Sequence, residues 1–403
     1  MKGSILEKIL LNHTEKTDFQ PGDVIPIKVD HIFIADNSAV PILKAMDDFH
    51  LSYPKCPVYL GLTYFHYQQQ KNYPEIQMKI INDAQKHQFI VMGELQGHWH
   101  HNLLNMNKIK PGNVVVGSDS TINFFSPLNT LSISCGSSDI IKTILTGNID
   151  YLVPRLVNIN LIGKLLPQTN AKDVALFLKQ EMEALNLKNF AVEFSGTHLA
   201  TLTQNELHTL SFHHYTINAE NFLFPPVIFN RNNTKTIKPD AEAKYYKELR
   251  FDVSKLEPMV KLKHEVYSVS DLESIKMHKV FIGNTIGGTI EDFEFLAKIL
   301  KGKKVAIPCF VTPACNDVLK AVTQKGYLTQ IIESGCTLLN PSTGICQSTN
   351  GVVVLKNENV LSSGIASLSM STGKSKANVY TGSVKTAIAT AISGKLTSLK
   401  EFL

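Results

Sequence analysis

Short apolar runs alternate with amphipathic helical patterns along the whole chain of 403 residues. Runs of four to eight apolar residues between turn residues indicate buried strands, and apolar positions spaced three and four apart indicate helices. Strands are predicted at 31–35, 88–93, 113–118, 279–283, 304–309 and 351–355. Helices are predicted at 38–49, 171–185, 289–300 and 383–396. This alternation predicts an α/β fold with doubly wound sheets.

One polar segment interrupts the pattern. FNRNNTKTIKPDAEAKYYKEL (229–249) is rich in Asn and Lys and contains a single Pro. Such composition is typical of a linker between domains. We therefore predict an N-terminal lobe of two subdomains at 1–229, a linker at 230–249 and a C-terminal lobe at 250–403.

FIGNTIGGTIEDF (281–293) combines a strand end, a glycine-rich turn and a helix start. Thr289 and Asp292 stand near the expected N-cap of that helix. Proteins of the α/β class place ligands at strand–turn–helix junctions of this kind. The turn from Gly283 to Gly288 is therefore a candidate binding site.

Composition limits the functional classes. Hydrophobic residues make up 43% and charged residues 19%, and no apolar run approaches the roughly 18 residues of a membrane span. The N-terminus lacks the pattern of a signal peptide, so we expect a cytoplasmic protein. The net charge of +5 is spread out and only three of forty basic residues are arginine, which disfavours nucleic-acid binding. The six cysteines contain no C-x-x-C pair and are expected to be reduced.

Six segments, in order, resemble the large subunit of isopropylmalate dehydratase, within the aconitase superfamily. PGNVVVGSDS (111–120) is similar to the family's V-V-G-T-D-S-H-T motif, and FIGNTIGGTIEDF resembles F-I-G-S-C-T-N-G-R-I-E-D-L. The other four segments are the opening at 7–46 and the stretches 153–178, 191–196 and 379–396. The resemblance implies aconitase-like lobes of α/β/α layers without the fourth, swivelling domain. It also implies a possible partner, the separate small subunit that carries that domain.

Family members hold a [4Fe–4S] cluster on three cysteines. By the resemblance, the first cysteine falls on Thr285, and the later pair falls on Thr343 and Cys346. A hydroxyl does not replace a thiolate as a ligand of a cluster iron, and a single thiolate cannot hold a cluster. We therefore predict that the [4Fe–4S] cluster is absent and that the chain has no cofactor.

Most acid–base residues of the family are also replaced. The histidine of the family motif G-I-x-H-Q matches His100 in GHWHHN, and Asp119 and Ser120 match as well. Tyr64 stands where the family has an acid–base histidine, and a phenol can donate a proton. The family's arginine-containing segment aligns with SLSMSTGKSK (367–376), which contains no arginine, and Lys374 is the nearest cation there. The expected catalytic set is His100, Tyr64, Asp119 and Ser120.

A substrate carboxylate is expected near the former cluster position. The predicted binding residues are Asn284, Thr285, Gly287, Thr343, Cys346 and Lys374. STGKS (371–375) ends like a phosphate loop but lacks its first glycine, so a plain surface turn is the alternative there. His98 and His100 with a carboxylate such as Asp119 could hold zinc or iron, whereas the alternative is a histidine inherited with the scaffold.

Two functions remain open at this point. The first is a cluster-free lyase or isomerase that acts on a small hydroxy- or unsaturated carboxylic acid or a derivative in the former cluster cleft. The second is a pseudoenzyme that binds a metabolite or a partner subunit without turnover. Binding of RNA, which some cluster-free relatives show, is the weakest idea because basic residues are scattered.

Overall fold

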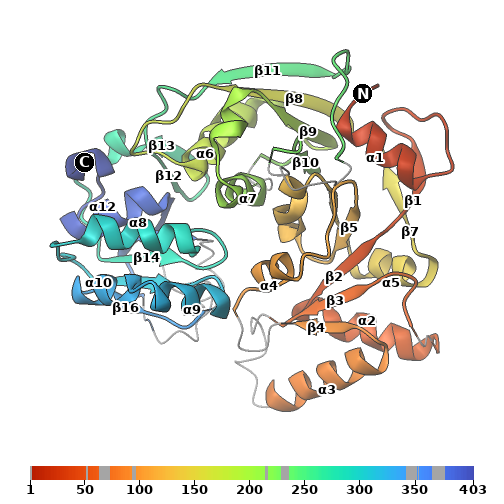
Figure 1. The fold of residues 1–403 in the computed structure, drawn as a ribbon, viewed down its shortest axis with the longest axis horizontal. Coiled ribbons are helices and arrows are strands. Elements are labelled where there is room, and N and C mark those ends of the chain that lie inside the picture. Colours follow the sequence, from red (N-terminus) through yellow and green to blue (C-terminus); the bar gives the residue numbers. More distant parts are fainter. Residues whose placement is uncertain are drawn as a thin grey trace. The chain divides into compact units, whose positions relative to one another are not determined.

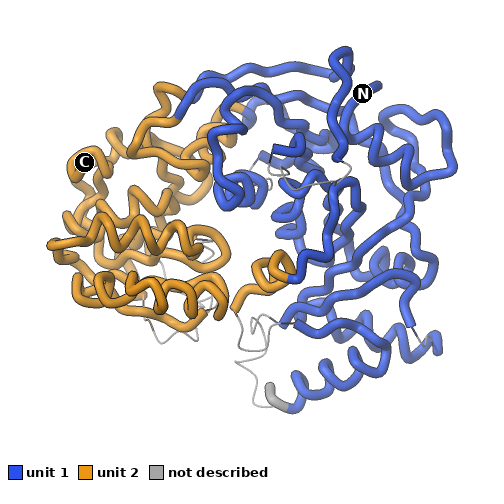
Figure 2. The backbone as a smooth tube through the Cα atoms, viewed as in Figure 1, with its two compact units in different colours: residues 1–92, 106–164, 182–253 blue, residues 93–105, 165–181, 254–403 orange. Residues whose placement is uncertain are grey.

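The computed structural model describes residues 2–50, 53–62, 73–92, 97–213, 217–227, 236–341, 352, 354–364 and 377–403. Within these ranges the chain forms two compact units (Figure 2). Unit 1 consists of residues 1–92, 106–164 and 182–253, and unit 2 consists of residues 93–105, 165–181 and 254–403.

Unit 1 contains a parallel five-stranded sheet in the order β4-β3-β2-β5-β6 (Figure 1). Its strands are β2 (His31–Ala35), β3 (Val58–Gly61), β4 (Ile90–Met92), β5 (Val114–Gly117) and β6 (Leu131–Ser134). The helices of this part are α2 (Asp36–Asp48), α3 (Tyr73–Lys86), α5 (Ser137–Thr146) and the 3-10 helix η1 (Ser120–Leu128). Helix α2 packs against α3, α5 and β2, so its apolar face closes the core of the sheet.

A second parallel sheet of unit 1 has the order β10-β9-β8-β11. Its strands are β8 (Arg155–Ile162), β9 (Phe190–Ser195), β10 (Asn221–Leu223) and β11 (Lys247–Asp252). Strands β1 (Val24–Lys28) and β7 (Asn148–Leu152) form an antiparallel ribbon. The remaining helical segments of unit 1 are α1 (Ile5–His13), α7 (Gln204–Phe212), and the 3-10 helices η2 (Glu183–Leu185) and η3 (Thr197–Thr201).

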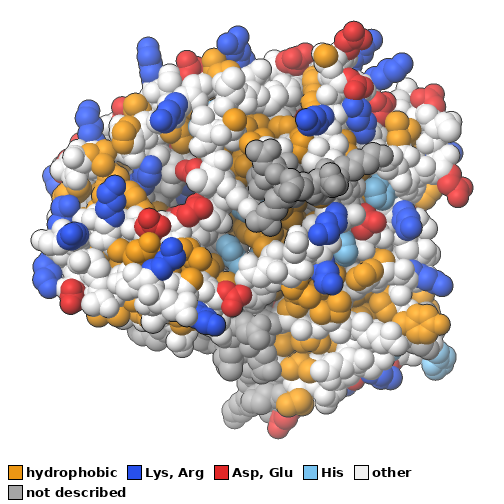
Figure 3. All heavy atoms as spheres, in the orientation of Figure 1, with side chains coloured by type: hydrophobic (Ala, Val, Ile, Leu, Met, Phe, Trp, Pro, Cys, Tyr) orange, Lys and Arg blue, Asp and Glu red, His pale blue; other side chains and the backbone are white. Residues whose placement is uncertain are grey.

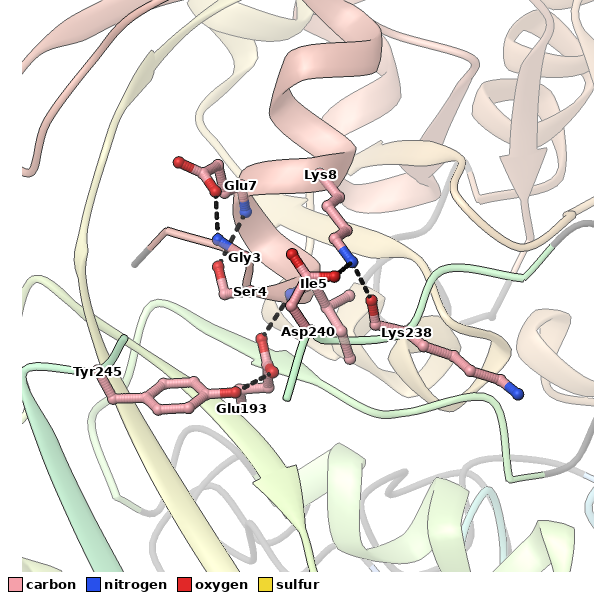
Figure 4. Close-up of polar contacts among 9 residues, drawn as sticks. All are labelled: Gly3, Ser4, Ile5, Glu7, Lys8, Glu193, Lys238, Asp240 and Tyr245. Carbon is pink, nitrogen blue, oxygen red and sulfur yellow. Dashed lines mark hydrogen bonds and ion pairs between the residues drawn. The ribbon is translucent and has the colours of Figure 1, made fainter. Parts of the chain in front are cut away.

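Helix α1 is fixed to this sheet by a buried carboxylate (Figure 4). Glu193 on β9 accepts a hydrogen bond from the backbone N–H of Ile5 at 2.9 Å and another from the Tyr245 hydroxyl at 2.7 Å. A negative charge at a helix N-terminus is favourable because the first amides of the helix lack intrahelical partners. The glutamate of the AVEFSG segment therefore has a structural role.

Unit 2 is built on a seven-stranded sheet in the order β13-β12-β18-β17-β14-β15-β16. Its strands are β12 (Met259–Leu262), β13 (Glu265–Ser268), β14 (Lys279–Gly283), β15 (Cys309–Thr312), β16 (Thr337–Leu338), β17 (Asn359–Ser362) and β18 (Asn378–Gly382). The five strands from β18 to β16 are parallel, and β12 pairs antiparallel with both β18 and β13.

The helices of unit 2 come from three parts of the chain. They are α4 (Trp99–Met106), α6 (Ala171–Met182), α8 (Ile290–Leu300), α9 (Asn316–Gln324), α10 (Tyr327–Glu333), α12 (Val384–Ser393), and the 3-10 helices η5 (Val269–Leu272) and η8 (Leu399–Phe402). Helix α12 packs against β14, and α8 packs against α9 and α10. An apolar core of these helices and the parallel strands fills the unit.

Most predicted elements are confirmed, with shifts of a few residues at their ends. The strand predicted at 304–309 is wrong, because β15 begins at Cys309 and runs to Thr312. The backbone N–H groups of Val305 and Ala306 donate instead to the carbonyls of Ser334 and Ala391. The strand predicted at 351–355 is also wrong for residues 352, 354 and 355, because the strand of this region is β17, which begins at Asn359. Residues 351 and 353 lie outside the described residues.

The compact units differ from the predicted lobes. Residues 93–105 and 165–181 belong to unit 2, although the sequence around them belongs to unit 1. The predicted linker at 230–249 ends inside β11, which pairs with β8 from Lys247 onward. Sequence composition marked a polar segment here but could not show that its last residues complete a parallel sheet.

Two surface properties bear on the sequence analysis. Among the described residues, no helix combines the length and apolar character needed to cross a bilayer. On the face drawn in Figure 3, Lys and Arg side chains are scattered among acidic and neutral ones. That face has no basic stripe of the kind that tracks a nucleic-acid backbone.

Candidate functional site

The carboxyl edge of the sheet in unit 2 contains a topological switch point. The chain leaves β14 toward β15 on one side, and it leaves β17 toward β18 on the other side. In open α/β sheets, ligands bind at the carboxyl ends of the two strands where the connections diverge. The predicted binding residues Asn284, Thr285 and Gly287 follow β14 at this point.

The turn after β14 is held in an unusual conformation. Gly283 has a φ of 100°, and a Cβ atom placed on it would lie 2.0 Å from the carbonyl oxygen of Thr312. Asn284 has a φ of 92°, a region that side chains other than glycine rarely occupy. Strained backbone of this kind persists only where the surrounding structure enforces it, and it is concentrated at binding sites.

Several amides of the turn are already engaged in the fold. The N–H of Gly283 donates to the Ser363 hydroxyl at 3.0 Å, that of Asn284 to the Thr312 carbonyl at 3.1 Å, and that of Ile286 to the Asn284 side chain at 3.2 Å. These three amides are therefore committed to the fold. Residues 285–287 form a hydrogen-bonded turn.

The side chain of Thr285 is the most informative group in the turn. It is 1% exposed, and its hydroxyl oxygen has no hydrogen-bond partner among the described residues. Buried hydroxyls without partners are uncommon because desolvation costs about 1–3 kcal/mol. An orphaned hydroxyl at a switch point indicates a position that a ligand can satisfy.

The histidines of GHWHHN are positioned in the same unit. Gly97 forms an antiparallel bridge with Cys315, and the N–H of His98 donates to the Ala314 carbonyl at 2.8 Å. Helix α4 begins with the next residue, Trp99. His100 is fully buried, and its Nδ1 lies 2.6 Å from Nδ1 of His98. The segment is thereby attached to the loop that follows β15.

His101 connects this helix directly to the turn. Its Nε2 lies 2.8 Å from the carbonyl oxygen of Thr285, so Nε2 carries the proton and donates. Burial lowers the pKa of His101, and it lowers the pKa of His98 to about 3. Both imidazoles are neutral at pH 7. From the sequence, only His98 and His100 of this segment were candidates, because strand or helix periodicity cannot reveal the contact of His101 with the turn.

Lys172 was also missed. The residue belongs to α6, is 2% exposed and donates from Nζ to the carbonyls of Ser363 at 2.6 Å and Gly364 at 3.0 Å. Gly364 adjoins the turn, since a Cβ on it would lie 2.2 Å from Nδ2 of Asn284. A buried ammonium group thus lies behind the loop after β17. A lysine inside an apolar helical run was the available signal.

The predicted residues Asp119 and Ser120 belong to unit 1. They follow β5 at the switch point between β2 and β5, so their placement at a carboxyl edge matches the expectation from the topology. The Asp119 carboxylate accepts a hydrogen bond from the N–H of Thr121 at 2.8 Å and caps η1. Ser120 is exposed. Capping of η1 is therefore a sufficient structural reason for an aspartate at position 119, even without a ligand.

Four predicted residues, Tyr64, Thr343, Cys346 and Lys374, lie outside the described residues. Among the described residues, no group of three or more His, Cys, Asp and Glu side chains is arranged to hold a metal ion. Two nitrogens bound to one tetrahedral zinc would lie about 3.3 Å apart, given bonds of about 2.0 Å. The contact of 2.6 Å between His98 and His100 is a hydrogen bond instead.

Comparison with known proteins extends over the whole chain. The family model described as the aconitase family (aconitate hydratase) matches residues 7–226 and 228–394. A 3-isopropylmalate dehydratase large subunit from Sulfurisphaera tokodaii is 27% identical, with 100% of both chains covered. A homoaconitase large subunit from Thermus thermophilus is also 27% identical, with 99% of this chain and 98% of the relative covered.

A solved structure supports the fold. The holo-form of aconitase X from Thermococcus kodakaraensis superimposes with a TM-score of 0.54 over 90% of this chain and 89% of that chain. The two sequences are 13% identical, so this likeness concerns the fold alone. The predicted α/β fold and the predicted superfamily are thus both confirmed.

Proposed function

The chain belongs to the aconitase family, and from this premise we propose that it is a cluster-free lyase or isomerase for a small hydroxy- or unsaturated carboxylic acid or a derivative. The ligand binds at the turn after β14 in unit 2. The observation that carries the proposal is the buried hydroxyl of Thr285, which no described residue satisfies. A substrate hydroxyl or carboxylate oxygen supplies the missing hydrogen-bond partner.

The absence of a [4Fe–4S] cluster is part of the proposal. Such a cluster needs thiolate ligands, and Thr285 stands where the resemblance places the first of them. Of the cysteines that the structure describes in unit 2, Cys309 and Cys336 lie at the amino ends of β15 and β16. Cys315 alone among them follows a strand at the carboxyl edge. These residues do not fit the cluster, and no step is assigned to it.

Binding of an anion is supported by the donors around the turn. The Thr285 hydroxyl, which has no partner among the described residues, can donate a hydrogen bond to an anion. Lys172 adds a buried positive charge behind the loop of Ser363 and Gly364. Because charge interactions strengthen away from water, one buried ammonium group can take over part of the role of the missing arginines.

Proton transfer in this site falls to the neutral imidazoles. A lyase that removes water needs a base for a carbon-bound proton and an acid for the leaving hydroxyl. His100 is the expected base or acid, and His101 orients the turn through the Thr285 carbonyl. Tyr64 and Asp119 remain predicted participants in the same chemistry, while Thr343, Cys346 and Lys374 remain predicted ligand contacts.

Ligand binding provides the main test. We expect malate-like hydroxy acids or their unsaturated counterparts to raise the melting temperature, because a ligand of the native state stabilises it. Thr285→Ala should abolish this rise and Thr285→Ser should retain it. Thr397→Ala is a matched control. Thr397 is also buried, and its hydroxyl also has no partner among the described residues, but it lies outside the turn after β14. A rise that survives in Thr285→Ala would contradict the proposed site.

The cluster and the reaction need separate measurements. Anaerobically purified protein should contain neither iron nor sulfide in stoichiometric amount, and a brown protein with about four irons would refute the cluster-free proposal. The same ligands should then be assayed for loss or gain of the ultraviolet absorbance of a conjugated acid. Binding without turnover of any bound acid would favour the pseudoenzyme.

A small partner subunit is the second part of the proposal. The relatives named above are described as large subunits, which is consistent with a heteromeric assembly. We infer that this chain, too, binds a small subunit that carries a swivelling domain. Co-expression with a candidate small subunit and size-exclusion chromatography would test it, and a chain that stays alone with every candidate would contradict it.

A further inference from the structure

The strongest unexplained feature of unit 2 is the contact between two buried imidazoles. The Nδ1 atoms of His98 and His100 are 2.6 Å apart, and their ring centroids lie 4.5 Å apart at an interplanar angle of 29°. His98 is 5% exposed and His100 is 0% exposed. Packing fixes both rings, because His98 is anchored to Ala314 and Trp99 stacks on His100 at 3.7 Å.

A hydrogen bond between two ring nitrogens requires a single shared proton. One Nδ1 must donate and the other must accept, since two bare nitrogens cannot bond and two N–H groups repel. Burial keeps the pKa of His98 low, so its ring is neutral at neutral pH. If both rings are neutral, they must be opposite tautomers. The ring that donates at Nδ1 has a bare Nε2, and the ring that accepts has a protonated Nε2.

We propose that His98 and His100 form a proton-relay dyad, in which His98 is the positioning residue that sets the tautomer of His100. A proton that enters at the bare Nε2 releases the Nδ1 proton to the neighbouring ring, which then loses its Nε2 proton. The two rings end with exchanged tautomers, and no net charge remains. This inference rests on the proposed function, because it assigns the acid–base chemistry of the same site.

The chain differs from the family at the residue that completes this dyad. The family motif quoted above has isoleucine where this chain has His98, and an isoleucine cannot form the bond. The neighbouring titratable groups among the described residues do not replace it. His101 donates to Thr285, and burial raises the pKa of the Cys315 thiol, which therefore stays protonated.

The dyad can be tested without a substrate. In long-range proton–nitrogen NMR spectra of the full chain with ¹⁵N-labelled histidine at pH 7, we expect one of the two rings to be protonated at Nδ1 and the other at Nε2. His98→Ile should shift the Nδ1 signal of His100. His98→Asn keeps a hydrogen-bond donor and acceptor near the position of the His98 ring, so its His100 signal should stay close to that of the unsubstituted protein. His264→Ile at an exposed position of unit 2 is the control and should leave the signal unchanged.

Three results would overturn the dyad. These are matching tautomers in the two rings, an imidazolium at pH 7, or a His100 signal that His98→Ile leaves unmoved in a folded variant. Melting curves of each variant establish folding. Because the spectra need no ligand, a failed dyad leaves the binding site at Thr285 standing. A failed ligand screen likewise leaves the dyad to be decided by the spectra.

Discussion

The two switch points of this molecule use their polar groups in opposite ways. At the carboxyl edge of β2 and β5 in unit 1, Asp119 caps η1 and the Ser118 hydroxyl accepts from the N–H of Ala35 at 3.0 Å. At the carboxyl edge of β14 and β17 in unit 2, the Thr285 hydroxyl has no described partner. The same topology therefore gives one edge at which Asp119 and Ser118 are engaged in the fold, and one edge at which the buried Thr285 hydroxyl has no described partner.

The difference shows why a switch point alone does not identify a site. Topology brings polar residues to a sheet edge, but only their hydrogen-bond partners decide whether they are available. Asp119 matches the family motif and caps η1, whereas Thr285 departs from the motif and is buried without a partner among the described residues. Substitutions at matched positions of the two edges can test this comparison.

Matched glycines should give the largest effect. Gly283→Ala forces a Cβ against the Thr312 carbonyl at 2.0 Å in a left-handed conformation, so we expect a loss of about 3 kcal/mol or more in unfolding free energy. Gly117→Ala at the edge of unit 1 needs no left-handed backbone but meets Cβ and Cγ1 of the buried Ile122 at 2.9 Å, so it should cost about 1–2 kcal/mol through overpacking. Urea unfolding measures the loss of unfolding free energy in both variants. Equal losses would contradict the proposed difference in backbone strain between the two turns.

A buried carboxylate should make the stability of unit 2 depend on pH. Burial raises the pKa of Asp173 to about 6, above its value in the unfolded chain. The folded state then holds the proton more tightly, so this contribution is fully present below about pH 4 and is lost as the pH rises through about 6. It amounts to a few kcal/mol at most, at about 1.4 kcal/mol per unit of pKa.

Asp173→Asn should flatten that pH dependence, although it also weakens the bonds that the carboxylate accepts from Met259 and Asn170. The measurement is the slope of unfolding free energy between pH 4 and pH 7 in the two proteins. A slope that is unchanged by the substitution would show that another group titrates.

The cap of η1 should have a smaller effect that is confined to stability. Asp119→Ala removes the acceptor for the N–H of Thr121 and should cost about 1 kcal/mol, while Asp119→Ser keeps a cap and should cost less. Thermal unfolding gives the difference. If the alanine variant instead keeps its stability and loses turnover of a bound acid, Asp119 is catalytic, and its cap is not its main role.

The smallest effect is expected at Thr285. Thr285→Ala removes a buried hydroxyl without a described partner, which stabilises the fold, and a buried methyl group, which destabilises it, so the net change should be less than about 0.5 kcal/mol. Thr289→Ala, four residues later, removes the capping box of α8 and should cost about 1–2 kcal/mol. A large loss in Thr285→Ala, measured by urea unfolding, would mean that the hydroxyl already has a partner in the fold.

The sequence predicted the framework well because hydrophobic periodicity reports local geometry. Strands at 31–35 and 279–283 are found at these residues, and Thr289 is the expected cap. The strand expected at 304–309 failed, because Val305 and Ile307 pack into the core without joining the sheet. The site was only partly predictable. Lys172 and His101 reach the turn through tertiary contacts that no local pattern encodes.

The interleaved make-up of unit 2 has a consequence for how the chain is made. The bond between Lys172 and Ser363 joins residues 191 positions apart, and α6 belongs to unit 2 although it precedes β9 of unit 1. A ribosome that adds about 5–20 residues per second completes α6 roughly ten seconds or more before the strand it serves. During that interval Lys172 and the apolar face of α6, which are buried in the complete fold, lack the later segments that cover them. The second half of the chain is thus not a transferable module, and cutting the gene at the linker would leave both products incomplete.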